Sequence, residues 1–135
     1  RILGCLMPLF FSTNHEMLHE AVRVLGNFSR MAGFRRLMSS CRVDETMNVL
    51  LDHPDEAVIF STAGVILNIS TDLEARRGLY SNNCEGLRKI TECLGRFGDS
   101  RPEIGIIICK ILLNLSSGIN TSDTRGGGGG AHELK

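Results

Sequence analysis

The chain has 135 residues, of which 42% are hydrophobic and 22% charged, a balance typical of a protein with one modest core or a short run of stacked repeats. Lys plus Arg number 15, as do Asp plus Glu, and this zero net charge excludes the basic surface that attracts nucleic acids and anionic membranes. No run of about 18 apolar residues occurs, so no membrane-spanning helix is predicted.

The five cysteines are odd in number and form no C-x-x-C pair, which predicts reduced thiols in a reducing compartment such as the cytoplasm. Cys5, Cys93 and Cys109 stand among Leu and Ile, so we predict that they are small core residues.

Residues 1–11 are mostly apolar around Pro8 and predict the end of a helix whose repeat begins upstream. The chain also begins at Arg1 with no initiator Met, which indicates a segment of a longer protein. Thr13 and Glu16 have the spacing of a capping box, so a helix with one broad apolar face is predicted from there to Arg30.

The next unit, residues 30–70, predicts three helical parts. A short first helix covers residues 34–41, and residues 47–51 form the inward stripe of a second. A turn with Pro54 then opens a third helix over residues 57–70. This third helix is apolar nearly all round, which predicts that it lies between two neighbouring helices.

Residues 71–117 follow the same plan. Thr71 and Glu74 match a second capping box, Leu87 and Ile90 belong to a second helix, and Pro102 opens a third that runs to about Ser117. The β-branched run at 104–108 is also compatible with a buried strand. Its register with the earlier repeats favours a helix.

Two pairs of arginines, Arg35-Arg36 and Arg76-Arg77, stand 41 residues apart and therefore mark one edge of the repeats. A solvated helix face and a basic strip that meets an acidic partner are both compatible with this pattern.

The composition changes at Gly118. A polar stretch leads to five consecutive glycines at 126–130, where the backbone is flexible because no side chain is buried to offset the entropy of ordering it. Residues 119–135 are therefore predicted to be a linker or tail. The repeats would occupy residues 1–118, divided at approximately 1–29, 30–70 and 71–117.

Each predicted third helix ends in the same motif, an apolar run followed by Asn, one apolar residue and Ser. The copies lie at residues 24–29, 65–70 and 111–116, and their asparagines are 41 and 46 residues apart. Self-similarity at this period is typical of helical solenoids.

Period, helix lengths, turns and terminal Asn together resemble the armadillo repeat family. The resemblance implies an all-α, right-handed superhelical solenoid of three-helix repeats, one partial and two full. It also implies a non-catalytic scaffold that binds proteins, with no cofactor. In this family the third helices line a groove in which a ladder of asparagines binds an extended peptide. Carried over to this chain, the ladder is Asn27, Asn68 and Asn114.

The residues one helical turn before each Asn share its face: Arg23, Gly64 and Lys110. Import receptors of the family often have Trp there, and this chain has no Trp, so a basic nuclear-import signal is a poor fit. The two cations predict instead an acidic or polar protein partner. The alternative for each Asn is purely structural, because a helix-terminal amide can satisfy backbone groups at a turn.

Three stretches, at residues 20–27, 60–68 and 109–114, resemble a family member associated with assembling the axoneme of motile cilia and sperm flagella. The resemblance therefore implies a cytoplasmic or ciliary protein. A different possibility is that the repeats only space other domains of a larger protein and bind nothing themselves.

His15-Glu16-Met17-Leu18-His19 matches H-E-x-x-H, in which two histidines one turn apart bind zinc and the Glu acts as general base. Glu16 already has a predicted structural role as capping-box acid, and the position expected for a third histidine ligand holds Leu25. His15 and His19 remain a weak metal-ligand pair, and a zinc metallopeptidase is the remote alternative.

Overall fold

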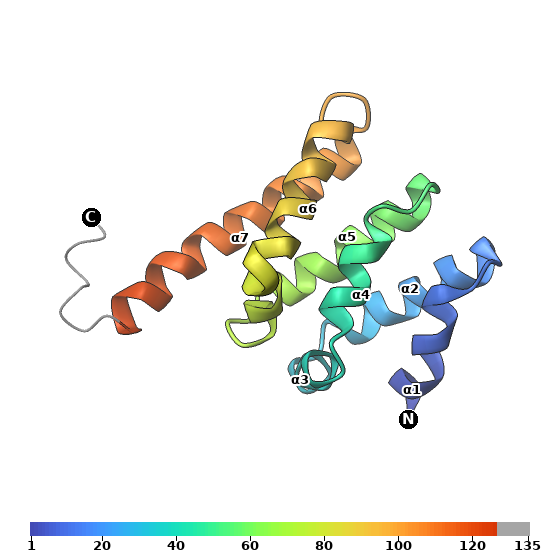
Figure 1. Ribbon diagram of the computed structural model, residues 1–135, viewed down its shortest axis with the longest axis horizontal. Helices are drawn as coiled ribbons and strands as arrows, with labels where there is room; N and C mark the ends of the chain where they lie inside the picture. The colour runs from blue at the N-terminus through green and yellow to red at the C-terminus, as the bar shows by residue number, and fades with distance from the viewer. Residues whose placement is uncertain (127–135) are drawn as a thin grey trace.

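The computed structural model describes the backbone of residues 1–126 and the side chains of residues 1–117. Within this range every regular element is a helix (Figure 1). In chain order they are α1 (Ile2–Leu6), the 3-10 helix η1 (Met7–Phe11), α2 (His15–Phe28), α3 (Ala32–Ser40), α4 (Val43–Leu50), α5 (Glu56–Ser70), the 3-10 helix η2 (Ala75–Tyr80), α6 (Ser81–Phe97) and α7 (Pro102–Gly126).

The third helices of successive repeats, α2, α5 and α7, pack side by side, and α4 and α6 pack against them from the second-helix layer (Figure 1). Their shared core runs through the whole described array. As predicted, α5 lies between two neighbours, and Ile59 and Ile66 on it are 1% and 0% exposed. The predicted all-α solenoid is therefore confirmed.

The β-branched run at 104–108 lies in α7 and not in a strand. Ile104, Ile108, Ile111 and Leu115 recur at helical spacing, and all four are at most 1% exposed. Burial of this stripe outweighs the weak local preference of Ile for extended backbone.

Both predicted capping boxes are wrong by one residue. Asn14 caps α2, accepting a hydrogen bond from the N–H of Met17 at 3.0 Å. Asp72 takes the same role before η2, and Thr71 instead donates to a carbonyl of α5. Asn and Asp side chains are at least as favourable as Thr at the N-cap position. In both places the Asn or Asp that follows the predicted Thr therefore caps the helix instead.

The predicted end of the last helix, near Ser117, is also wrong, because α7 continues to Gly126. Gly118 is the only helix-breaking residue type in this extension before Gly126, and one glycine costs only about 1 kcal/mol relative to Ala. The predicted tail at 119–135 thus begins as helix, and its residues 127–135 lie outside the described residues.

Of the three cysteines predicted to be core residues, Cys93 is buried, and burial raises the pKa of its thiol. Cys5 and Cys109 are exposed, so the prediction is wrong for both. Their apolar sequence neighbours point to the core from other faces of the same helices.

No single described helix is long and apolar enough to cross a membrane. Helix α5 and the segment Ala75–Phe97 meet the length and composition of a membrane span only when they are taken together, and the chain bends by 116° between them.

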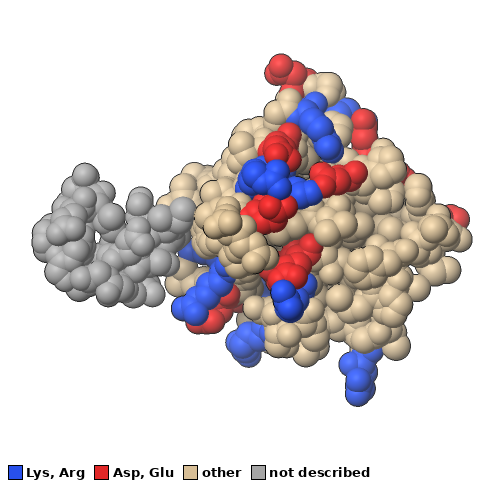
Figure 2. All heavy atoms as spheres, viewed as in Figure 1, with Lys and Arg blue, Asp and Glu red and all other residues tan. Residues whose placement is uncertain are grey.

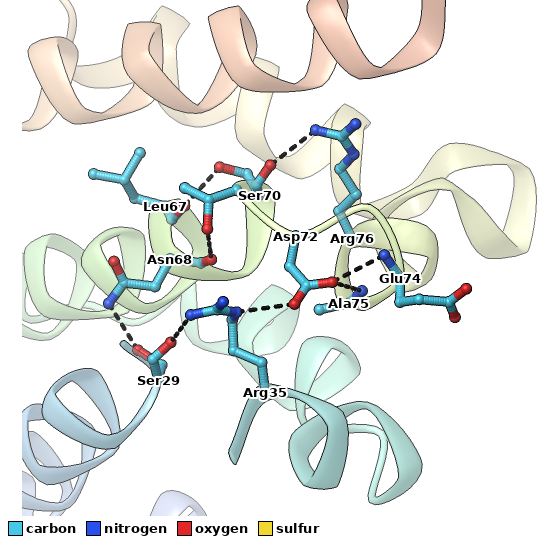
Figure 3. A network of polar contacts seen from close by, with 10 residues as sticks. Ser29, Arg35, Leu67, Asn68, Ser70, Asp72, Glu74, Ala75 and Arg76 are labelled. Atoms are coloured by element: carbon cyan, nitrogen blue, oxygen red, sulfur yellow. Dashed lines mark hydrogen bonds and ion pairs between the residues drawn. The ribbon is translucent and has the colours of Figure 1, made fainter. Parts of the chain in front are cut away.

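The arginines Arg35 and Arg76 hold successive repeats together. Arg35 Nη1 donates to the carbonyl of Ser29, and Arg76 Nη1 to the carbonyl of Ser70, at 2.9 and 3.0 Å (Figure 3). Both carbonyls terminate a third helix, where backbone acceptors lack intrahelical partners. Arg76 is 7% exposed, so neither a solvated face nor a basic strip describes it.

We predict that Arg76→Met lowers the free energy of unfolding by about 2 kcal/mol, because the carbonyls of Ser70 and Asn114 lose a charged donor at a buried site. The measurement is urea unfolding followed by circular dichroism. The matched control is the exposed neighbour Arg77→Met, expected within about 0.5 kcal/mol of the parent. Equal stability of the two variants would contradict a structural role for Arg76.

Candidate partner-binding groove

A groove of about 500 Å³ lies between α2 and α5. Four of the six predicted partner-binding residues line it together: Arg23, Asn27, Gly64 and Asn68. The remaining lining residues are Glu20, Val22, Val24, Gly26, Arg30, Phe60, Ser61 and Leu67.

The other two predicted residues, Lys110 and Asn114, do not line this groove. Lys110 borders a separate, mostly apolar pocket of about 400 Å³ formed with Leu94, Pro102 and Ile106. Asn114 is half-buried on α7, where it faces the end of α5. Of the predicted asparagine ladder, Asn27 and Asn68 therefore lie in the groove, whereas Asn114 lies at the junction of α5 and α7.

Asn68 ties α5 to α2 (Figure 3). Its Nδ2 lies 2.8 Å from the hydroxyl of Ser29 and 3.2 Å from the carbonyl of Gly26. The hydroxyl of Ser29 already donates to the carbonyl of Gly26 at 2.7 Å, so it can only accept from Asn68. Two acceptors facing the same atom fix that atom as the amide nitrogen.

Asn114 repeats the arrangement one junction later. Its Nδ2 donates to the hydroxyl of Ser70 at 3.0 Å, and that hydroxyl donates to the carbonyl of Leu67 at 2.6 Å. Ser29 and Ser70 are both 0% exposed. Each Asn–Ser pair is thus a buried link between neighbouring third helices, which we call the Asn–Ser clasp.

The clasp limits what the ladder can offer to a partner. One amide hydrogen of Asn68 is shared between Ser29 and Gly26, because these two acceptors lie in nearly the same direction from Nδ2, so its oxygen and second hydrogen remain for a peptide. Asn27 is exposed, and among the described residues its side chain has no hydrogen-bonded partner. Within the described residues Asn27 therefore keeps its full capacity to donate and accept, as a peptide backbone requires.

The groove also contains a cation that the sequence pattern did not single out. Arg30 is exposed, lies three residues beyond Asn27, and forms no ion pair with the described residues. Arg23 is instead paired with Glu20 on its own helix at 2.9 Å, and both side chains are more than half exposed. The i, i+3 spacing from the motif Asn could have identified Arg30 as a groove residue.

Elsewhere on the surface, charges are largely neutralised in pairs. Arg88 on α6 bonds Glu85 and Glu92, and Lys89 pairs with Asp52 beyond the end of α4. Figure 2 shows acidic and basic side chains adjacent to one another on this face, without a broad patch of one sign. Arg30 is one of the described cations without an ion pair, and the one among the residues that line the groove.

The two histidines of the H-E-x-x-H motif do not converge on a metal site. His19 Nε2 lies 2.9 Å from the hydroxyl of Ser61 on α5, whereas the ring of His15 packs edge-on against His53 at 4.6 Å. Among the described residues no group of three His, Cys, Asp or Glu side chains could hold a metal ion. Burial lowers the pKa of His53, and the nearby His15 lowers it further, which favours the neutral ring.

The stacked three-helix units and their junctions define an armadillo-type α-solenoid. The chain is similar to armadillo repeat-containing protein 2, with 34% identity over 117 residues to the Mus musculus protein, 32% over 121 residues to that of Bos taurus and 31% over 123 residues to that of Homo sapiens. The matches cover 87%, 90% and 91% of this chain but 14% of each relative, so the chain spans about a seventh of their length. No protein-family model matches the chain. The resemblance to armadillo repeats is confirmed.

We predict that Asn68→Ala lowers the free energy of unfolding by about 1 to 3 kcal/mol, because buried acceptors on Ser29 and Gly26 lose their donor. Asn27→Ala is the matched control from the same motif position and should change stability by less than about 0.5 kcal/mol. Thermal and urea unfolding of both variants provide the measurement. Similar losses in the two variants would show that the clasp has no special role in stability.

Proposed function

We propose that this chain is a non-catalytic segment that binds a partner protein in the groove between α2 and α5. The observation that carries the proposal is the placement of Arg23, Asn27, Gly64 and Asn68 around one cavity of about 500 Å³. The armadillo-type relatives support a repeat-based interaction scaffold.

The groove favours a partner segment with both acidic and apolar side chains. Arg30 provides an unpaired positive charge within the described residues, and Asn27 provides backbone hydrogen bonds. Phe60 and Val24 are 41% and 39% exposed there and provide apolar contact. At Gly64 no atom beyond its own stretch of helix lies within 4 Å of the position of an added Cβ, which leaves room for a partner side chain.

Lys110 belongs to this proposal only if the partner extends beyond the groove, because the apolar pocket beside it is separate. A long partner segment could continue across α7 to Lys110, where a second acidic residue would be favoured. Neither a nucleic acid nor a membrane is proposed as partner, given the balanced charge.

Short acidic peptides that bind the immobilised chain are selected first. We predict that these peptides bind Arg30→Glu about tenfold or more weakly than the parent chain, because the substitution turns an attraction into a repulsion. Arg36→Glu is the matched control, because Arg36 is also exposed but lies on α3, outside the groove. Fluorescence anisotropy at low and high salt measures the affinity of each variant for the peptides. If no acidic peptide is selected, or if both variants bind equally, the segment acts as a spacer. Asn68 is unsuitable as the probe because its amide holds the repeats together.

The resemblance to an axoneme-assembly protein supports a more specific proposal, that the partner acts in building motile cilia or sperm flagella and that the chain is cytoplasmic or ciliary. A tagged protein that contains this segment should accumulate at the base or along the axoneme of motile cilia. The Arg30→Glu form should accumulate less than the Arg36→Glu form. Even distribution through the cytoplasm in every case would contradict the proposal.

A further inference from the structure

A second pocket, of about 210 Å³, lies where α4 meets η2 and α6. All of its walls come from these three elements, which pack against one another inside the chain and not at either end of it (Figure 1). None of the residues described in its lining also lines the groove between α2 and α5. Sites for small molecules usually measure about 300–1,000 Å³, so this pocket has the size for a single long side chain.

Two buried acceptors beside this pocket lack the donors that such groups normally have. Asn48 lines the pocket and is 6% exposed, and its Oδ1 has no hydrogen-bond partner among the described residues. Asp44, one helical turn earlier on the same face of α4, is 8% exposed and forms no ion pair with the described residues. Buried acceptors of both kinds are costly when they stay unpaired, so these two favour a ligand that donates.

The carboxylate of Asp44 lies directly behind the wall of the pocket. It contacts Gly78, which lines the pocket, so closely that a Cβ added there would collide with Oδ2 of Asp44. Burial raises the pKa of Asp44 in spite of hydrogen bonds from nearby backbone N–H groups, so the fold itself stabilises its charged form poorly. A negative charge in such a position attracts a cation into the pocket, because burial reduces screening by water.

The lining adds further carboxylates. Arg42 bonds Glu45 only through Oε2, which leaves Oε1 of Glu45 as an acceptor. Glu85 and Lys89 line the pocket from α6, and each pairs with an opposite charge outside the lining. The charges of the lining are thus compensated in pairs, and the charge of Asp44 behind them is the one that a ligand would neutralise.

We propose that this pocket binds the guanidinium group of an arginine side chain from a partner protein. A guanidinium has five N–H donors in a planar fork, so it can donate to Oδ1 of Asn48 and Oε1 of Glu45 at once. It is also more weakly hydrated than the ammonium of lysine and therefore enters a small pocket at a lower cost. A metal ion fits less well, since among the described residues no group of three His, Cys, Asp or Glu side chains could hold one. The site does not depend on the groove, and either can be tested without the other.

The experiment is a titration of the ¹⁵N-labelled chain with Nα-acetylarginine amide, followed by NMR. The side-chain amide of Asn48 and the backbone N–H of Gly78 should shift saturably, with a Kd of about 1–10 mM for so small a probe. Nα-acetyl-lysine amide carries the same charge and should bind about tenfold more weakly, because it lacks the planar fork.

Two variants separate ligand binding from a purely structural role. Asp44→Asn should weaken binding of the arginine amide about tenfold and raise the midpoint of urea unfolding, since a buried charge without an ion pair is removed. Asn48→Leu should abolish the shift at Gly78 without lowering that midpoint, because it removes an acceptor that has no partner. The matched control is Asp99→Asn, which removes an exposed charge outside the pocket and should leave binding unchanged.

The proposal would be overturned if no saturable shift appeared up to about 50 mM arginine amide, or if the lysine amide bound equally well. Unchanged affinity in Asp44→Asn would also overturn it. A loss of stability in both Asp44→Asn and Asn48→Leu would show instead that the two acceptors are satisfied within the fold.

Discussion

The stacking of this chain depends on the serines at the ends of α2 and α5. Ser29 and Ser70 are completely buried, so every polar group of these residues needs a partner inside the protein. The hydroxyl donates within its own helix and accepts from the Asn of the following repeat, and the carbonyl accepts from an arginine of that repeat. One residue thus receives two donors from its neighbour, which fixes the distance and register between the two repeats.

The network also extends along the array. Arg35 bonds both Ser29 and Asp72, so one guanidinium joins the end of α2 to the start of the next repeat (Figure 3). Burial by itself would raise the pKa of Asp72. Hydrogen bonds from the N–H of Ala75 and from Arg35 outweigh burial and hold that pKa below its usual value. The carboxylate stays ionised and caps η2 while it accepts from Arg35.

The sequence was sufficient for the repeat architecture and for most helices, because apolar periodicity reports burial directly. It placed Arg23, Asn27, Gly64 and Asn68 on one surface, since a constant repeat length puts equivalent residues in equivalent positions. It could not show which atoms the clasp uses. Whether Asn68 faces a partner or the preceding Ser29 depends on a rotation of the side chain, which spacing does not determine. The roles of Arg35 and Arg76 were missed for a similar reason, because a long side chain can reach a buried acceptor from a helix that looks solvated.

In such an array the clasp determines which groups of an Asn stabilise the stack and which remain to bind a partner. An amide hydrogen that is used between repeats cannot also donate to a peptide, so each interior junction takes one hydrogen from the backbone-binding capacity of its Asn. Asn27 escapes this constraint because the partner it would clasp is absent from the described residues. Within the described residues the exposed amide of Asn27 is therefore available in full to a peptide in the groove, whereas Asn68 beside it offers its oxygen and one hydrogen. A partner segment in the groove would then be bound most firmly by its backbone at Asn27, and the clasp would hold α5 in register beneath it.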